Sequence, residues 1–84
     1  MKTDKAFKNI LADVGVCLAD LRLKKGYPTI KSFADKYDLP EIQYWRMEKG
    51  KANVTLKSLG RILNIHRISL QDFFCIISEQ KAAA

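Results

Sequence analysis

The sequence predicts an all-α fold, a compact domain of five helices, and three observations indicate it. Apolar residues recur at spacings of three and four along most of the chain, which is the period of an amphipathic helix. Only two Pro and four Gly are present, too few for the many turns of an all-β fold. The length of 84 residues favours one domain, which we expect over residues 1–78, followed by a disordered tail at residues 79–84.

The first predicted helix covers the N-terminal part of the chain. Gly26 is expected to end it, because Gly adopts the left-handed conformation of a helix terminus without steric cost. Pro28 then disfavours an immediate restart. The apolar residues of this helix fall on one stripe, which we expect to face the core: Phe7, Ile10, Leu11, Val14, Cys17, Leu18 and Leu21.

Two short helices are predicted next, separated by a tight turn. Thr29 caps the first of them, since its side-chain oxygen accepts a hydrogen bond from a free backbone N–H group, and this helix runs to about Tyr37. Pro40 suits the first position of the next helix, where its missing N–H would have no partner. That helix runs to Lys49 and is followed by Gly50. Because the connection is short, the pair is expected to form a helix-turn-helix at the centre of the chain.

Two further helices complete the predicted fold. Thr55 caps a fourth helix, which we expect to end near Asn64, a residue that tolerates the left-handed conformation. Ser69 caps a fifth helix, with Asp72 at the acidic position of a capping box. The apolar positions are Leu56, Leu59, Ile62 and Leu63 in the fourth helix and Leu70, Phe73, Phe74, Ile76 and Ile77 in the fifth.

The positive charge of the chain is concentrated in its middle. The net charge is +6. From Arg22 to Arg67 there are 11 Lys or Arg against 4 Asp or Glu, and the remaining residues hold 4 basic and 5 acidic side chains. This distribution indicates a polyanionic partner for the middle of the chain. A basic face that serves only solubility is the alternative.

Several other classes of protein are not expected. The N-terminus is charged and no apolar run is long enough to span a membrane, so we expect a cytoplasmic protein without a signal peptide. Cys17 and Cys75 are then expected to be reduced, partly buried thiols. Neither they nor His66 has the spacing of a metal site. Phosphate-binding loops and nucleophile motifs are absent, so we expect neither an enzyme nor a cofactor, and we expect His66 in a surface loop.

The segment at residues 29–51 carries a motif with characteristic spacing. Ala34 is a small residue inside the first of the two short helices, and Asp38 stands four residues later, in the turn. The segment closes with Glu-Lys-Gly-Lys at residues 48–51, and upstream Arg22 stands four residues before Gly26. In these residues, and over about residues 18–74, the chain resembles the phage-repressor family, also known as Cro/repressor or XRE-type regulators. The resemblance implies that the two motif helices cross closely at Ala34 and that Asp38 adopts a positive φ. The bulky apolar positions of the motif are Phe33, Tyr37, Leu39, Tyr44 and Met47.

The resemblance implies a lambda-repressor-like domain that binds double-stranded DNA sequence-specifically, with the helix at residues 40–49 in the major groove. It implies a structural ion pair between Arg22 and Glu48. Arg46 would read guanine, and Glu41 would accept from the amino group of cytosine. The alternative for Trp45 is a half-buried position against the second helix, without contact with DNA. The expected base contacts are Glu41, Ile42, Trp45 and Arg46, and the expected backbone contacts are Thr29, Lys31, Gln43, Lys49, Lys51 and Asn53.

The expected function is that of a repressor-like transcriptional regulator that needs no cofactor. We expect a homodimer on DNA, because two reading helices then meet successive turns of the major groove. The candidate dimer surface lies on the fifth helix and contains Phe73, Phe74, Ile76 and Ile77, which could instead close the core. The rival function is a protein-interaction module or an antitoxin of the same fold, acting through Ile42, Tyr44 and Trp45.

Overall fold

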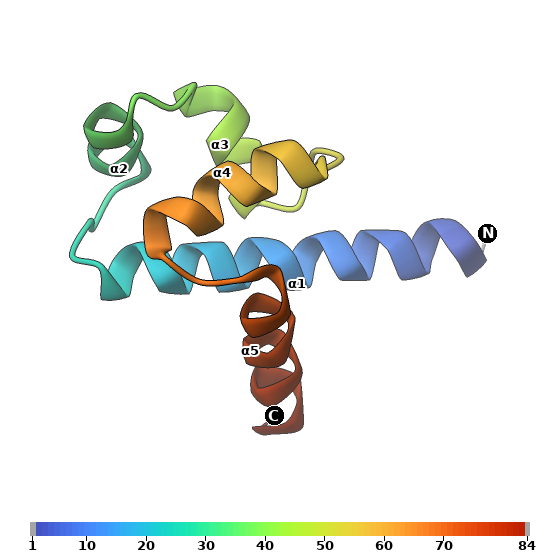
Figure 1. Ribbon diagram of the computed structural model, residues 1–84. Coiled ribbons are helices and arrows are strands. Elements are labelled where there is room, and N and C mark those ends of the chain that lie inside the picture. Colours follow the sequence, from blue (N-terminus) through green and yellow to red (C-terminus); the bar gives the residue numbers. More distant parts are fainter. Residues whose placement is uncertain (1, 84) are drawn as a thin grey trace. The chain divides into compact units, whose positions relative to one another are not determined.

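The computed structural model describes the backbone of residues 2–83 and the side chains of residues 9–80. Over these residues the fold is all-α, with five helices and no strand (Figure 1). The fold class predicted from the sequence is therefore confirmed. No helix in the described part of the chain is both long and apolar enough to cross a membrane. The helices are α1 (Lys2–Lys24), α2 (Ile30–Tyr37), α3 (Glu41–Glu48), α4 (Leu56–His66) and α5 (Leu70–Ala83).

The chain divides into two compact units, Met1–Asn53 and Val54–Ala84. The first unit contains α1, α2 and α3, and the second contains α4 and α5. The helix-turn-helix and all the residues expected to contact DNA lie in the first unit. The prediction of one domain over residues 1–78 stays a prediction.

The core stripe of α1 is shorter than the sequence predicts. Its central residues are buried, but Ile10 is 54% exposed and Leu21 is only partly buried. The backbone of Gly50, just after α3, meets α1 at Ala12, so Ile10 lies ahead of the part of α1 that α3 and its following loop cover. The side chain of Phe7 lies outside the described residues. The buried residues of the stripe are Leu11, Val14, Cys17 and Leu18.

Two local features fix the pair α2 and α3. The Thr29 side chain accepts a hydrogen bond from the backbone N–H of Ser32 at 3.0 Å, which confirms the predicted cap. Asp38 follows α2 with a φ of 55°, the left-handed conformation that the motif requires. The N–H of Leu39 then donates to the carbonyl oxygen of Ala34 at 2.9 Å. Pro40 precedes α3 as an extended cap residue rather than as its first helical residue.

A close approach of backbones joins α1 to α3. Gly15 lies in the middle of α1, and a Cβ atom built on it would overlap the backbone carbonyl oxygen of Glu48. Glycine in a helix interior lowers stability relative to alanine by about 0.5–1 kcal/mol. At this position only glycine allows the end of α3 to reach α1, so the packing requires it.

The second unit begins as predicted and continues further. Thr55 accepts a hydrogen bond from the backbone N–H of Ser58 at 3.1 Å, which confirms it as a cap. α4 passes through Asn64 and ends at His66, and the φ of the C-cap residue Arg67 is 57°. The prediction that Asn64 ends the helix is therefore wrong, and His66 is the last residue of α4 rather than part of a loop. Leu56, predicted on the buried face, is 73% exposed, because it occupies the first position of the helix. The buried residues of α4 are Leu59, Ile62 and Leu63.

The last helix begins at the predicted cap. The backbone N–H of Asp72 donates to the Ser69 side chain at 3.0 Å. α5 then continues to Ala83, through residues expected to form a disordered tail, since Ala has the highest helix propensity of all residues and Glu, Gln and Lys also favour helix. Ala84 lies outside the described residues.

Candidate nucleic-acid interface

The helix α3 has one buried and one exposed face. Tyr44, Met47 and Glu48 are 2%, 4% and 7% exposed, and the ring of Tyr44 lies 5.2 Å from that of Phe33 on α2. Burial raises the pKa of the Tyr44 hydroxyl well above its usual value, and the neighbouring Glu48 carboxylate adds to the rise. The side of α3 that carries these residues is thus fixed against α1 and α2, and the opposite side faces outward.

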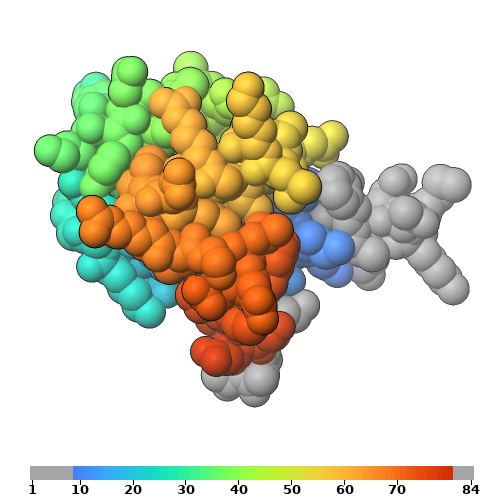
Figure 2. Space-filling model, viewed as in Figure 1, coloured from blue at the N-terminus to red at the C-terminus, as the bar shows by residue number. Residues whose placement is uncertain are grey.

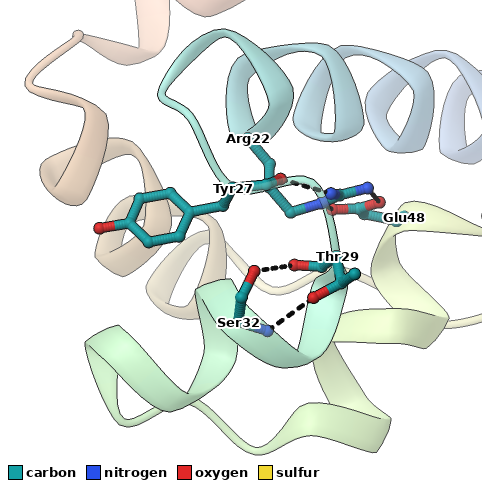
Figure 3. Close-up of polar contacts among 5 residues, drawn as sticks. All are labelled: Arg22, Tyr27, Thr29, Ser32 and Glu48. Carbon is teal, nitrogen blue, oxygen red and sulfur yellow. Dashed lines mark hydrogen bonds and ion pairs between the residues drawn. The ribbon is translucent and has the colours of Figure 1, made fainter.

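A buried ion pair ties the end of α3 to the end of α1. Arg22 donates two hydrogen bonds to the Glu48 carboxylate, from Nε at 2.8 Å and from a terminal nitrogen at 3.1 Å. Its other terminal nitrogen donates to the backbone carbonyl oxygen of Tyr27 at 2.7 Å (Figure 3). The hydrogen bonds to Glu48 raise the pKa of Arg22. The two residues named as an ion pair from the sequence are therefore in contact, and Arg22 also holds the connection that leads into α2.

The outward side of α3 carries the four residues expected to contact bases. Glu41 and Arg46 are exposed, Ile42 is 77% exposed and Trp45 is 40% exposed. In the space-filling view, side chains from the green part of the chain, which includes the start of α3, stand at the surface (Figure 2). This side therefore offers one acid, one base and two apolar side chains to a partner.

Trp45 is held by a cation. The Lys51 ammonium lies 5.7 Å from the centre of the Trp45 ring, within the range of an attractive cation–π contact. Lys51 comes from the loop after α3, so the contact orients the indole ring and brings a positive charge beside the outward side of α3. The sequence did not indicate this pairing.

The residues expected to contact the DNA backbone are all exposed: Thr29, Lys31, Gln43, Lys49, Lys51 and Asn53. Three of them already have partners within the chain: Lys51 at the Trp45 ring, and also Thr29 and Lys31. Thr29 caps α2, with Ser32 donating both to its side chain and to its carbonyl oxygen (Figure 3). The Lys31 ammonium lies 3.2 Å from Asp35 on its own helix and 4.0 Å from Glu41 on α3. Lys31, predicted to contact a phosphate, is therefore paired with two carboxylates, and Asp35 stands at the helical spacing of four that allows such pairs.

Two predicted partner surfaces need correction. Tyr44 is buried, so it leaves the proposed protein-binding surface, where Ile42 and Trp45 remain. On α5, Phe73 is fully buried, whereas Phe74 is 44% exposed. The remaining members of that surface, Ile76 and Ile77, are partly buried. Phe73 therefore contributes to the core of the chain itself, and Phe74 is the most exposed of the four residues.

The two cysteines differ from one another. Cys17 is buried and Cys75 is exposed, and both are free thiols. Burial, together with the charge of Asp20, raises the pKa of Cys17, which makes its thiolate scarce. Neither thiol is partly buried as expected, since Cys17 is fully buried and Cys75 is exposed on α5.

Comparisons with protein-family models, with curated proteins and with solved structures found no match.

Proposed function

We propose that the protein binds double-stranded DNA sequence-specifically and acts in the cytoplasm as a repressor-like transcriptional regulator of the XRE type. The observation that carries the proposal is the division of α3 into a fixed inner side and an exposed outer side. A helix held in this way can enter the major groove and present only its outer side chains to base edges. Arg46 can form a two-pronged hydrogen bond to guanine, and Ile42 can pack on a thymine methyl group.

Charge supports the same proposal. Arg46, Lys49 and Lys51 lie on or just after α3 and are exposed. The free N–H groups at the start of α2, next to Thr29, suit a phosphate oxygen. Together these groups would position the outer side of α3 on the duplex, while the base contacts select the sequence. No step of this proposal needs a metal or a cofactor.

A homodimer on DNA is part of the proposal. A single short helix reads few base pairs, and two copies related by a twofold axis would place two reading helices in successive major-groove turns. The operator would then be an inverted repeat. Of the surface named on α5, Phe74 is the side chain that such a pairing would bury.

The proposal is tested by selecting bound sequences from random duplex DNA with the full chain. We expect an enriched inverted repeat, with an affinity that falls steeply as salt rises because several phosphate contacts release counterions. Lys49→Ala and Lys51→Ala should each weaken binding to all sequences about equally and reduce the salt slope by about one unit. Selection without any enriched sequence would contradict the proposal.

The exposure of Ile42 and Trp45 favours one second candidate, a protein-interaction module such as an antitoxin. Docking through an apolar patch depends weakly on salt, in contrast to binding through phosphates. This candidate would be supported by a chain that shows no DNA sequence preference and binds a protein instead. Salt should leave that complex intact, whereas Ile42→Asp should abolish it.

A further inference from the structure

Lys31 occupies a position that helix energetics does not favour. It lies in the first turn of α2, where the partial positive charge of the helix start repels a cation. Its pair with Asp35 has the lysine N-terminal to the acid, the weaker of the two orientations along a helix. Within α2, Lys31 therefore gains only the weakly oriented pair with Asp35, and its second carboxylate partner lies on α3.

The contact beyond α2 is with Glu41, the first residue of α3. The ammonium of Lys31 lies 3.2 Å from the Asp35 carboxylate and 4.0 Å from that of Glu41. Both carboxylates raise the pKa of Lys31, Asp35 more strongly. The three side chains span the helix-turn-helix at its surface. Glu41, the acid expected to contact a base, lies at one end of this group.

A carboxylate at the start of a reading helix has a particular difficulty. It must approach a base edge between two rows of phosphates, which repel it. A lysine that moved from Glu41 to a phosphate would leave Asp35 and Glu41 without the neutralising charge beside the DNA. A lysine that stays between them offsets part of this repulsion and limits the positions that the Glu41 side chain can take.

We propose that Lys31 is a positioning residue that determines specificity: it holds the Glu41 carboxylate at the groove-facing start of α3 and offsets its charge there, rather than binding a phosphate itself. This inference rests on the proposed function and deepens it. It predicts that the contribution of Lys31 to sequence discrimination is confined to the base pair that Glu41 contacts.

The test is a double-mutant cycle on the full chain. Binding of the selected duplex and of all its single-base variants is measured at fixed salt, together with the salt dependence on random-sequence duplex, for wild type, Lys31→Met, Glu41→Gln and the double variant. Lys31→Arg is the conservative variant. Lys36→Met is the matched control, since it removes the same charge from an exposed site on the same helix.

We expect Lys31→Met to lower discrimination by about two- to fivefold, the range for an exposed ion pair. The loss should fall at the base pair where Glu41→Gln also lowers discrimination. In the Glu41→Gln background the same change should have no further effect at that pair. Lys31→Arg should retain most of the preference, and Lys36→Met should leave it unchanged.

Three outcomes would overturn the proposal. A uniform loss of affinity over all sequences, with the salt slope reduced by about one unit in both backgrounds, would make Lys31 a phosphate contact. Additive losses from Lys31→Met and Glu41→Gln would mean that the two side chains act independently. A wild type without any sequence preference would remove the proposed function itself, and this result differs from the first two, in which the wild type still selects a site.

Discussion

The helix pairs α2–α3 and α4–α5 begin with the same cap and contain the same kind of turn, but their second helices differ in charge. α2 begins with Thr-Ile-Lys-Ser at residues 29–32 and α4 with Thr-Leu-Lys-Ser at residues 55–58. In each, the Thr side chain accepts a hydrogen bond from the Ser backbone N–H, at 3.0 and 3.1 Å. Each first helix ends on a residue other than glycine with positive φ, 55° at Asp38 and 57° at Arg67.

The second helices of the two pairs carry different charges. From Glu41 to Lys51, α3 and the loop after it hold three basic and two acidic residues, and all three basic side chains are exposed. α5 holds one basic residue, Lys81, against two acids, Asp72 and Glu79, so its net charge is negative and would repel a polyanion. The same caps and the same kind of turn therefore occur in two helix pairs whose second helices carry different charges.

The largest expected difference between the pairs concerns how the second helix is anchored. Glu48→Ala should lower the free energy of unfolding by about 3–5 kcal/mol, because it leaves the Arg22 charge buried without its partner. Ser69→Ala, which removes only the N-terminal cap of α5, should cost about 1 kcal/mol. Urea unfolding of both variants measures the difference.

A paired replacement sharpens this result. Arg22→Met with Glu48→Met should lose less stability than Glu48→Ala alone, since no charge is then left buried. If the losses in unfolding free energy of the single variants Arg22→Met and Glu48→Met add up to that of the double variant within about 0.5 kcal/mol, the ion pair contributes no stability of its own.

The next largest effect concerns DNA. Arg46→Ala on α3 should reduce discrimination at one base pair per half-site by about 1–3 kcal/mol, while affinity for random duplex falls only modestly. Gln71→Ala, at an exposed position of α5, is the control in the other pair and should alter neither quantity. A binding profile over all single-base variants of the selected site at fixed salt provides the measurement. Equal effects of the two changes would mean that the outer side of α3 has no special role.

The caps allow the two pairs to be compared directly. Thr29→Ala and Thr55→Ala should each lower the free energy of unfolding by about 1 kcal/mol, because both remove the same capping hydrogen bond. Only Thr29→Ala should also weaken DNA binding, uniformly over sequences and with little change in salt slope, since the lost contact is uncharged. Unfolding curves and duplex titrations below the transition separate the two effects. A loss of DNA binding from Thr55→Ala of the same size would contradict the assignment of Thr29.

The features that the sequence predicts well are those set by a few neighbouring residues. The caps at Thr29, Thr55 and Ser69 depend on one side-chain oxygen and one N–H three residues on, and all three are present. The contact between Arg22 and Glu48 joins residues far apart in the chain, and it was expected only because the resemblance to a family supplied the pairing.

The features that the sequence predicts poorly depend on packing or on an unusual residue choice. Asn64 looked like the end of α4 because Asn tolerates the left-handed conformation, but the helix continues to His66 and Arg67 adopts that conformation instead. Gly15 could have been noticed as a glycine in a helix interior, which usually has a packing reason. Its partner, the backbone of Glu48, could not be found without the fold. Phe73 and Phe74 are both apolar, and only the packing decides which one is buried.

The smallest expected effect compares the two left-handed turns. A residue other than glycine in this conformation costs about 1–2 kcal/mol, less for Asp, whose short side chain bonds locally. Glycine removes that cost, but the greater conformational freedom of the unfolded chain lowers the free energy of unfolding by about 0.5–1 kcal/mol. Arg67→Gly should therefore raise the free energy of unfolding by several tenths of a kcal/mol to about 1 kcal/mol, and Asp38→Gly by less, close to zero.

Arg67→Ala is the control for this last comparison, because it removes the side chain while keeping a Cβ atom at a φ of 57°. If the gain comes from the backbone, Arg67→Ala should give none of it in urea unfolding. If alanine stabilised the protein as much as glycine, the gain would come from removing the arginine side chain. A larger gain at Asp38 than at Arg67 would contradict the argument in another way, because it would mean that the turn between α2 and α3 is the more strained of the two, in spite of its better-suited residue.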